Sequence, residues 1–249
     1  MKKIIAYFTL VIMITACDTE NANDCFQATG TIIAQEIAVA PFTKIRVNRD
    51  VELILTEGAI QKVEIETGEN LINDVTVVVS SGRLIITENN TCNLLRDYNV
   101  TKVYVTAPNI TEIISATQFI IRSNGVLNYD EIKLLSEDFT DTTVLATGKV
   151  ILSLNSQNVI VVGNNLTDFT LSGTTDNLNV TFASGDGVFN AENLVANTVT
   201  VFHRGTNKMI VNPQNELSGQ LRSTGNLIAK NRPSIVNVEQ FYTGILIFE

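Results

Sequence analysis

EIISAT (112–117), IKLLSED (132–138), ILSLNSQN (151–158), VTFASGDG (180–187), VTVFHRGT (199–206) and GQLRSTGN (219–226) are six segments of this chain that share one pattern. In each segment apolar and polar residues alternate and then give way to a small corner of Ser, Thr, Gly, Asn or charged residues. The alternation has the two-residue period of a half-buried β-strand. The segments therefore predict a repeated unit of a strand followed by a corner.

The corners recur at a nearly constant spacing. Their successive intervals are 21, 19, 29, 20 and 20 residues, counted between Ser115, Ser136, Asn155, Ser184, Arg204 and Thr224. A period near 20 residues, made of strands with no helix between copies, is typical of a β-solenoid. Each coil of such a fold buries its inward side chains only by stacking on its neighbours, so we expect an all-β rod.

The region before the repeats also predicts strands. Alternating segments occupy residues 42–47, 51–56, 62–67, 75–80, 84–87 and 101–106, and an apolar final strand occupies 244–248. Gly58, Gly68 and Gly82 supply turns between them. Because all-β folds of 200–250 residues often form one domain, we expect residues 25–249 to be a single domain.

The first 16 residues have the features of a bacterial lipoprotein signal peptide. Lys2 and Lys3 precede an apolar run at 4–16, which is too short for a stable membrane span. The run ends in Ile-Thr-Ala-Cys, which resembles a lipobox, so Cys17 is predicted to be lipidated and to become the first residue. The alternative is an ordinary signal peptide followed by a chance cysteine. Residues 17–24 are acidic and predict a flexible tether. The tether resembles the surface-routing signals of Bacteroidetes lipoproteins, and a merely solvated linker is the alternative.

Net charge limits the partners that this chain can have. The formal net charge is −9, and loss of Lys2 and Lys3 with the signal peptide makes it −11. An acidic chain without a basic stripe repels phosphate backbones, so nucleic acid is not an expected partner. The predicted partners are a membrane, reached through the N-terminal lipid, and a glycan or an envelope protein.

Two cysteines remain once Cys17 is lipidated. Cys25 and Cys92 form an even pair in an exported protein, which favours a disulfide over two free thiols. In the chain-entropy account, closing this loop stabilises the fold by roughly 4 kcal/mol.

Short motifs in a fixed order give the chain a family resemblance. They are DCFQATG (24–30), PFTKIRV (41–47), VELILTEG (51–58), SGRLII (81–86), TCN (91–93), SGDG (184–187), STGN (223–226) and YTGIL (242–246). Together they resemble the auto-transporter adhesin head GIN domain family over residues 24–248. The resemblance implies a right-handed parallel β-helix that is common among Bacteroidetes lipoproteins, and it brings no catalytic residue pattern.

Acidic residues are the candidates for any chemistry on this scaffold. Carboxylates from neighbouring coils form the sites of polysaccharide-active β-helix enzymes, often beside a basic residue. The candidate acids are Glu137, Asp138, Asp141, Asp168, Asp176 and Asp186, and the candidate basic partners are Arg204 and Lys208. The first three acids could also hold calcium, although their spacing matches no defined calcium loop. Simple solvation of surface acids is the alternative that we favour, so we expect no cofactor, metal or catalytic site.

Three functional hypotheses follow from these patterns. The first is a lipid-anchored, non-enzymatic protein of the outer membrane, periplasmic or surface-exposed, that acts in adhesion or surface binding. The second is a polysaccharide lyase, a glycoside hydrolase or a glycan-binding module. The third is a structural protein that forms homo-oligomers through exposed strand edges. The lone histidine, His203, argues against a serine triad, because such a triad needs a positioned base.

Lipidation of Cys17 can be tested directly. In bacterial cells the Cys17→Ser variant is expected to lose acyl labelling and to move from the detergent phase to the aqueous phase on Triton X-114 partitioning, because multiple acyl chains hold a protein stably in a membrane. A Cys92→Ser variant should still partition with detergent. Equal partitioning of the wild type and Cys17→Ser would contradict the lipoprotein hypothesis.

Overall fold

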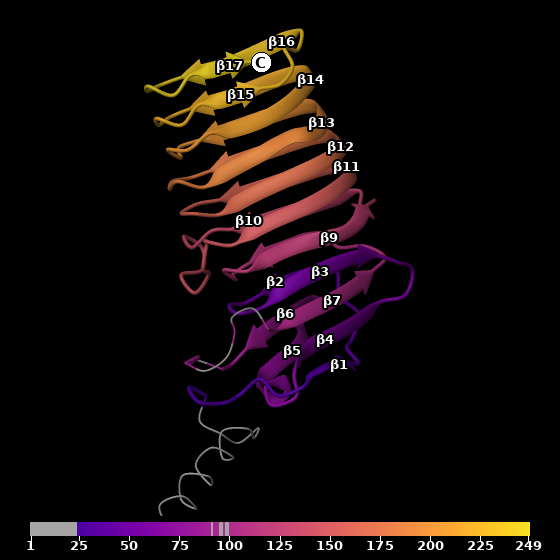
Figure 1. Ribbon diagram of the computed structural model, residues 1–249. Helices are drawn as coiled ribbons and strands as arrows, with labels where there is room; N and C mark the ends of the chain where they lie inside the picture. Colours follow the sequence, from indigo (N-terminus) through magenta and orange to yellow (C-terminus); the bar gives the residue numbers. More distant parts are fainter. Residues whose placement is uncertain (1–23, 91, 95–96, 98–99) are drawn as a thin grey trace, which may run out of the picture.

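The computed structural model of this protein describes residues 24–90, 92–94, 97 and 100–249 (Figure 1). The predicted signal peptide, Cys17 and most of the tether lie outside the described residues. The described part is all-β apart from one 3-10 turn, and no helix within it is long and apolar enough to cross a membrane. The elements are β1 (Ile32–Glu36), β2 (Lys44–Val47), β3 (Glu52–Glu57), β4 (Lys62–Gly68), η1 (Ile72–Asp74), β5 (Val75–Ser80), β6 (Arg83–Glu88), β7 (Lys102–Ala107), β8 (Glu112–Ser115), β9 (Ile120–Leu127), β10 (Glu131–Ser136), β11 (Lys149–Gly163), β12 (Asp168–Phe182), β13 (Val188–His203), β14 (Met209–Leu221), β15 (Leu227–Ala229), β16 (Ile235–Gln240) and β17 (Leu246–Phe248).

All 17 strands belong to one curled sheet (Figure 1). Each long strand contributes to two sides of it: β11 pairs in parallel with β9 over Lys149–Leu154 and with β10 over Asn158–Gly163. Side 1 consists of β3, β7, β9, β15, β17 and the first halves of β11–β14, and side 2 consists of β2, β6, β8, β10, β16 and their second halves. Corner residues such as Asn155–Gln157 join side 1 to side 2. One passage of the chain over both sides is called a layer, and turns such as 164–167 lead to the next layer.

The interior is made of rows of apolar side chains that stay in register from layer to layer. One row on side 1 is Val150, Phe169, Phe189, Met209 and Leu227, each no more than 1% exposed. The rows of the two sides meet inside, since the ring centroids of Phe169 on side 1 and Phe182 on side 2 are 6.1 Å apart. The core residues of the described part lie between Phe42 and Ala229, so we expect residues 24–249 to fold without residues 1–23.

The layers do not follow the order of the chain throughout. β2 pairs in parallel with both β6 and β8, and β3 with both β7 and β9, so the first layer lies between two later ones. Antiparallel pairs produce this arrangement: β4 pairs with β7, and β5 turns back into β6 at Ser81 and Gly82. Both turn residues have positive φ (51° and 71°), as the tightest hairpin turns require.

One predicted corner is wrong. Ser136 aligns with Gly163, whereas Asn155 aligns with Thr174 at the opposite end of the layer. The 12-residue segment 137–148 between β10 and β11 lengthens this layer, so the true column is Ser115, Ser136, Gly163, Phe182, His203, Leu221 and Gln240. The segment ILSLNSQN was assigned to the wrong column of corners because apolar and polar residues alternate in the same way on both sides of the sheet.

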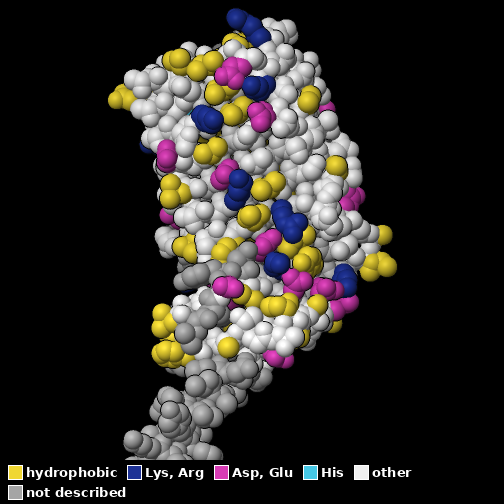
Figure 2. Space-filling view, in the orientation of Figure 1, with side chains coloured by type: hydrophobic (Ala, Val, Ile, Leu, Met, Phe, Trp, Pro, Cys, Tyr) yellow, Lys and Arg dark blue, Asp and Glu magenta, His cyan; other side chains and the backbone are white. Residues whose placement is uncertain are grey.

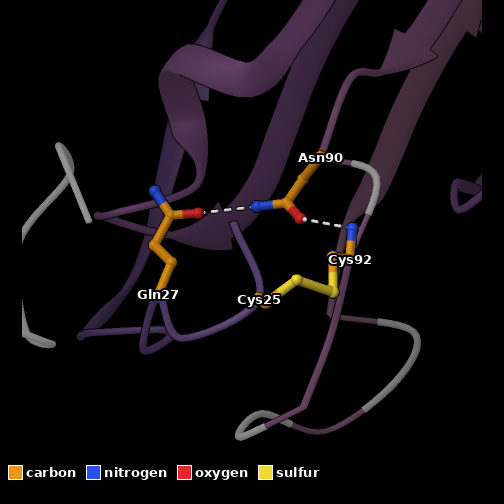
Figure 3. The surroundings of a disulfide bond; sticks show 4 residues. All are labelled: Cys25, Gln27, Asn90 and Cys92. Atoms are coloured by element: carbon orange, nitrogen blue, oxygen red, sulfur yellow. Dashed lines mark hydrogen bonds between the residues drawn. A yellow bond between two sulfur atoms is a disulfide. The ribbon is translucent and has the colours of Figure 1, made fainter. Parts of the chain in front are cut away.

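A disulfide closes the N-terminal end of the sheet. Cys25 is bonded to Cys92, with 4.5 Å between their Cα atoms (Figure 3). Beside it the buried Gln27 accepts a hydrogen bond from Asn90 Nδ2 (2.6 Å) and donates one to the carbonyl of Asn70 (2.7 Å). The disulfide therefore attaches the start of the domain to the segment that follows β6.

The phenylalanine cluster provides a test of the core. Phe182→Ala is expected to lower the free energy of unfolding of residues 24–249 by about 3–5 kcal/mol, because it leaves a cavity among fully buried rings. Phe139 is 57% exposed, so Phe139→Ala is the matched control and should change stability by less than about 1 kcal/mol. Denaturation in guanidinium chloride measures the free energy of unfolding of both variants. Equal losses would contradict the described core.

Candidate functional site

A polar groove crosses the corners of four successive layers, from the one that contains β9 and β10 to that of β13. We call it the corner groove; its volume is about 460 Å³. It is lined by Asn128, Asp130, Asn155, Ser156, Gln157, Thr174, Thr175, Asp176, Val195 and Asn197. Nearly all of its lining residues are polar. The corner groove is therefore a candidate for binding a polar ligand.

Hydrogen bonds between layers hold the side chains of the corner groove in place. Asn155 Nδ2 donates to Asn128 Oδ1 (2.9 Å), and Thr174 Oγ1 donates to Asn155 Oδ1 (2.9 Å). Further along, Asn197 Nδ2 donates to Asp176 Oδ1 (2.8 Å). Because neighbouring strands lie about 4.8 Å apart, these bonds form a regular ladder of amide, hydroxyl and carboxylate groups.

The chemistry of the corner groove favours neutral or cationic polar ligands. Asp130 and Asp176 supply carboxylates, and none of its lining residues is basic or aromatic. Hydroxyl-rich molecules can exchange hydrogen bonds with amides and carboxylates, because these groups offer both donors and acceptors. Anionic ligands would meet two uncompensated acids there.

The three acids predicted around residues 137–141 are all engaged, Glu137 within its own loop and the other two partly or wholly by residues outside it. Glu137 was expected at the surface but is only 7% exposed, because its carboxylate accepts bonds from the backbone amides of Phe139 and Thr140 (both 3.0 Å) and from the Thr140 hydroxyl. Asp141 accepts bonds from the Thr143 hydroxyl (2.6 Å) and amide (3.0 Å) and pairs with Arg46 (2.6 Å). These contacts with Thr143, and then with Arg46, hold the pKa of Asp141 well below its usual range.

Asp138 and Asp186 lie on one edge but do not converge. Asp138 accepts hydrogen bonds from the side-chain amides of Asn164 (2.5 Å) and Asn165 (2.7 Å), which lower its pKa. The Asp186 amide bonds the Asn165 carbonyl, so the two acids are two layers apart, about 10 Å by strand spacing. Asp186 itself accepts a bond from Thr206 (2.7 Å).

The remaining predicted partners lie apart from the corner groove. Asp168 forms an ion pair with Lys149 of the neighbouring layer (3.3 Å), and Arg204 and Lys208 are exposed at a turn. Positive and negative side chains are interspersed over much of the face shown in Figure 2. Within the part of the chain that the structure describes, no three His, Cys, Asp or Glu side chains lie together as in a metal site.

His203 is part of the core. It is 1% exposed and stands in register between Phe182 and Leu221, with its ring 6.3 Å from that of Phe182. Its Nε2 lies 2.9 Å from the Asn207 carbonyl oxygen, which can only accept, so Nε2 carries the proton. Nδ1 is buried without a partner among the described residues. Burial lowers the pKa of the imidazole.

The sequence prediction found one residue of the corner groove, Asp176, and missed the others. Asn155 and Ser156 were placed in a corner, but at the wrong end of their layer. A spacing of 19–21 residues from Asn155 through Thr174 to Val195 marks the correct column. This signal emerges only when the register of the layers is known.

These layers and their polar corner define an all-β protein with a side groove. The family described as "Putative auto-transporter adhesin, head GIN domain" matches residues 41–233. This match spans most of the sequence, so the chain belongs to that family. No curated protein matches the chain.

Solved structures share the fold at low sequence identity. A putative adhesin from Bacteroides fragilis NCTC 9343 aligns over 89% of this chain and 99% of its own, with 19% identity and a TM-score of 0.79. A putative lipid binding protein from Parabacteroides distasonis ATCC 8503 aligns over 89% and 98%, with 14% identity and a TM-score of 0.66. A putative adhesin from Parabacteroides merdae ATCC 43184 aligns over 88% and 98%, with 14% identity and a TM-score of 0.59.

The burial of His203 predicts a pH-dependent stability. Its folded pKa lies below the value of about 6.5 in the unfolded chain, so its contribution is complete above that pH and is lost as the pH falls. Between pH 7.5 and pH 5.5 the wild type should lose more stability than His203→Leu, by at most about 1.4 kcal/mol per pH unit. Denaturant titrations at both pH values give this difference. An equal change of stability with pH in the wild type and in His203→Leu would show that folding does not change the pKa of His203.

Proposed function

We propose that this chain is a lipid-anchored, non-enzymatic protein of the cell envelope that binds a glycan through the corner groove. Family membership supports a role in adhesion, and the lipobox-like Cys17 supports an outer-membrane anchor. The described chain starts at one end of the sheet, opposite its C-terminus (Figure 1). An anchor at Cys17 would therefore hold the sheet by that end and leave its side free for a ligand.

The ladder of the corner groove is the observation on which the proposal depends. Three layers present Asn155, Thr174 and Asn197 at exposed positions, and interlayer hydrogen bonds hold their side chains in place. A groove whose polar groups are already positioned costs less conformational entropy on binding. A linear glycan laid across the layers would meet the same kinds of donor and acceptor in each.

We also propose that the layers wind as a right-handed β-helix. The parallel, in-register pairing of β11, β12, β13 and β14 supports this, as does the strong preference of parallel crossovers for the right-handed sense. In that geometry the corner groove runs along one side of the rod, and its polar ladder repeats with the layers.

The engaged state of the predicted acids favours binding over catalysis. A glycosidase needs two free carboxylates on either side of the scissile bond, whereas Asp138, Asp141 and Asp168 are each occupied by fixed partners. Asp130 and Asp176 share the corner groove, and a polysaccharide-active enzyme there would have to act through this pair, although Asp176 also accepts a bond from Asn197 (2.8 Å).

A glycan array with residues 24–249 tests the proposal. We expect a glycan ligand whose affinity falls at least tenfold in Asn197→Ala, because the alanine removes a fixed amide from the corner groove. Asn179→Ala is the matched control, since Asn179 is also an exposed asparagine but lies outside the corner groove. Its affinity should be that of the wild type.

Two results would contradict the proposal. One is the absence of any glycan ligand, or an equal loss of affinity in both variants. The other is product formation in a lyase and hydrolase screen with added Ca²⁺, lost in Asp176→Asn, which would establish the enzymatic alternative.

A further inference from the structure

The two ends of the sheet are closed differently. At the N-terminal end the antiparallel strands β1, β4 and β5 lie beyond β7 and β6, and Val75, Val77 and Val79 of β5 pack against the core. At the other end lies the terminal layer, residues 235–248, which contains β16 and β17. β16 pairs only with β14, and β17 only with β15, so among described residues their outer edges are unpaired. Repeat folds usually cover such an end with a capping element.

The terminal layer exposes residues that belong to the interior rows. Val236 is in register with Leu217, yet Leu217 is 0% exposed and Val236 is 40% exposed. On side 1 Leu246 is in register with the fully buried Leu227 but is itself only partly buried. Other large apolar side chains exposed in this layer are Ile235, Phe241, Tyr242 and Ile245. Figure 2 shows hydrophobic side chains at this end of the molecule.

The sequence of β16 gives its open edge little protection. Edge strands are commonly protected by charged side chains, above all lysine, by proline or by a bulge. Ile235–Gln240 contains one charged residue, Glu239, and no lysine or proline, and its uninterrupted register with β14 shows that it has no bulge. The net charge of this end of the chain does not oppose association either. Residues 216–249 contain three acids and three bases, whereas the whole chain has a formal net charge of −9. Two copies approaching by this end would therefore not repel each other.

We propose that the terminal layer binds the terminal layer of a second copy of this chain, end to end. A partner for this surface must bring an unpaired strand edge and apolar rows with the same spacing, and a second terminal layer has both. A two-fold arrangement closes the assembly at a dimer, because it uses the same surface twice. Association of opposite ends would instead build a filament through the N-terminal end, where β1 and β5 also have unpaired edges among the described residues but the valines of β5 cover the core.

The dimer has a direct bearing on adhesion. In such a dimer the two described chains start at opposite ends, because the described chain starts at the end of the sheet opposite the terminal layer (Figure 1). If the lipid anchor of the proposed function is present, the two anchors enter facing membranes, and the contact joins two cells. Dimerisation itself does not depend on the anchor or on the corner groove, so it can be tested separately.

Sedimentation equilibrium of residues 24–249 tests the dimer. We expect a reversible monomer–dimer equilibrium, and small-angle scattering should give a dimer about twice the length of the monomer. Val236→Lys should raise the dimer dissociation constant at least about tenfold, since it places a charge in the contact. Val195→Lys is the control, because Val195 is 41% exposed but lies in the middle of the sheet.

Several outcomes would overturn the proposal. The first is a monomer at every concentration, and the second is a dimer dissociation constant that Val236→Lys leaves unchanged. The third is an equal rise of that constant in Val78→Lys, since Val78 is exposed on β5 at the other end of the sheet. Should Val236→Lys fail to fold by circular dichroism, Ile245→Lys, in the turn of the same layer, takes its place. A scattering length close to that of the monomer would indicate side-by-side association and would also overturn it.

Discussion

In-register parallel pairing is the constraint on which the rest of this structure depends. Side chains alternate between the inside and the outside along every strand, so a slip of one residue in any layer would turn its apolar row toward water. Continuous rows such as the one from Val150 to Leu227 stabilise a single register. The same register places Asn155 beside Asn128 and Thr174 and thereby creates the ladder of the corner groove.

Local patterns predicted the elements of this fold, but not how the layers align. Alternation identified most of the strands, though not β1, β9, β15 or β16, and cysteine number pointed to the Cys25–Cys92 bond that the structure contains. Alternation is identical on both sides of the sheet, so it could not tell that Asn155 belongs with Thr174 rather than with Ser136. The place of β2 and β3 between later layers depends on pairings far apart in sequence, and the corner groove depends on register, so neither has a local signal.

Most of the predicted acids make contacts with residues of their own layer or of a neighbouring layer. Asp138 bonds Asn164 and Asn165, Asp168 pairs with Lys149, and Asp186 bonds Thr206. Exposed ion pairs contribute little each to stability, typically below about 1 kcal/mol. Acidic residues in a repeat protein therefore indicate a site only when their neighbours leave them unoccupied.

The enclosed position of the first layer has a consequence for export. Glu52 pairs with Lys102, and Leu53 pairs with Ile121, so both neighbours of β3 emerge at least 50 residues after it. A chain threaded across a membrane from its N-terminus would hold this strand without any partner until β7 had passed, and without its second partner until β9 had passed. Pairing between strands so far apart in sequence slows folding and leaves unpaired apolar strands free to pair wrongly or to aggregate. If the chain is exported as proposed, we therefore expect it to depend on chaperones in the receiving compartment more than a simple repeat array does, because such an array can fold progressively from its N-terminus.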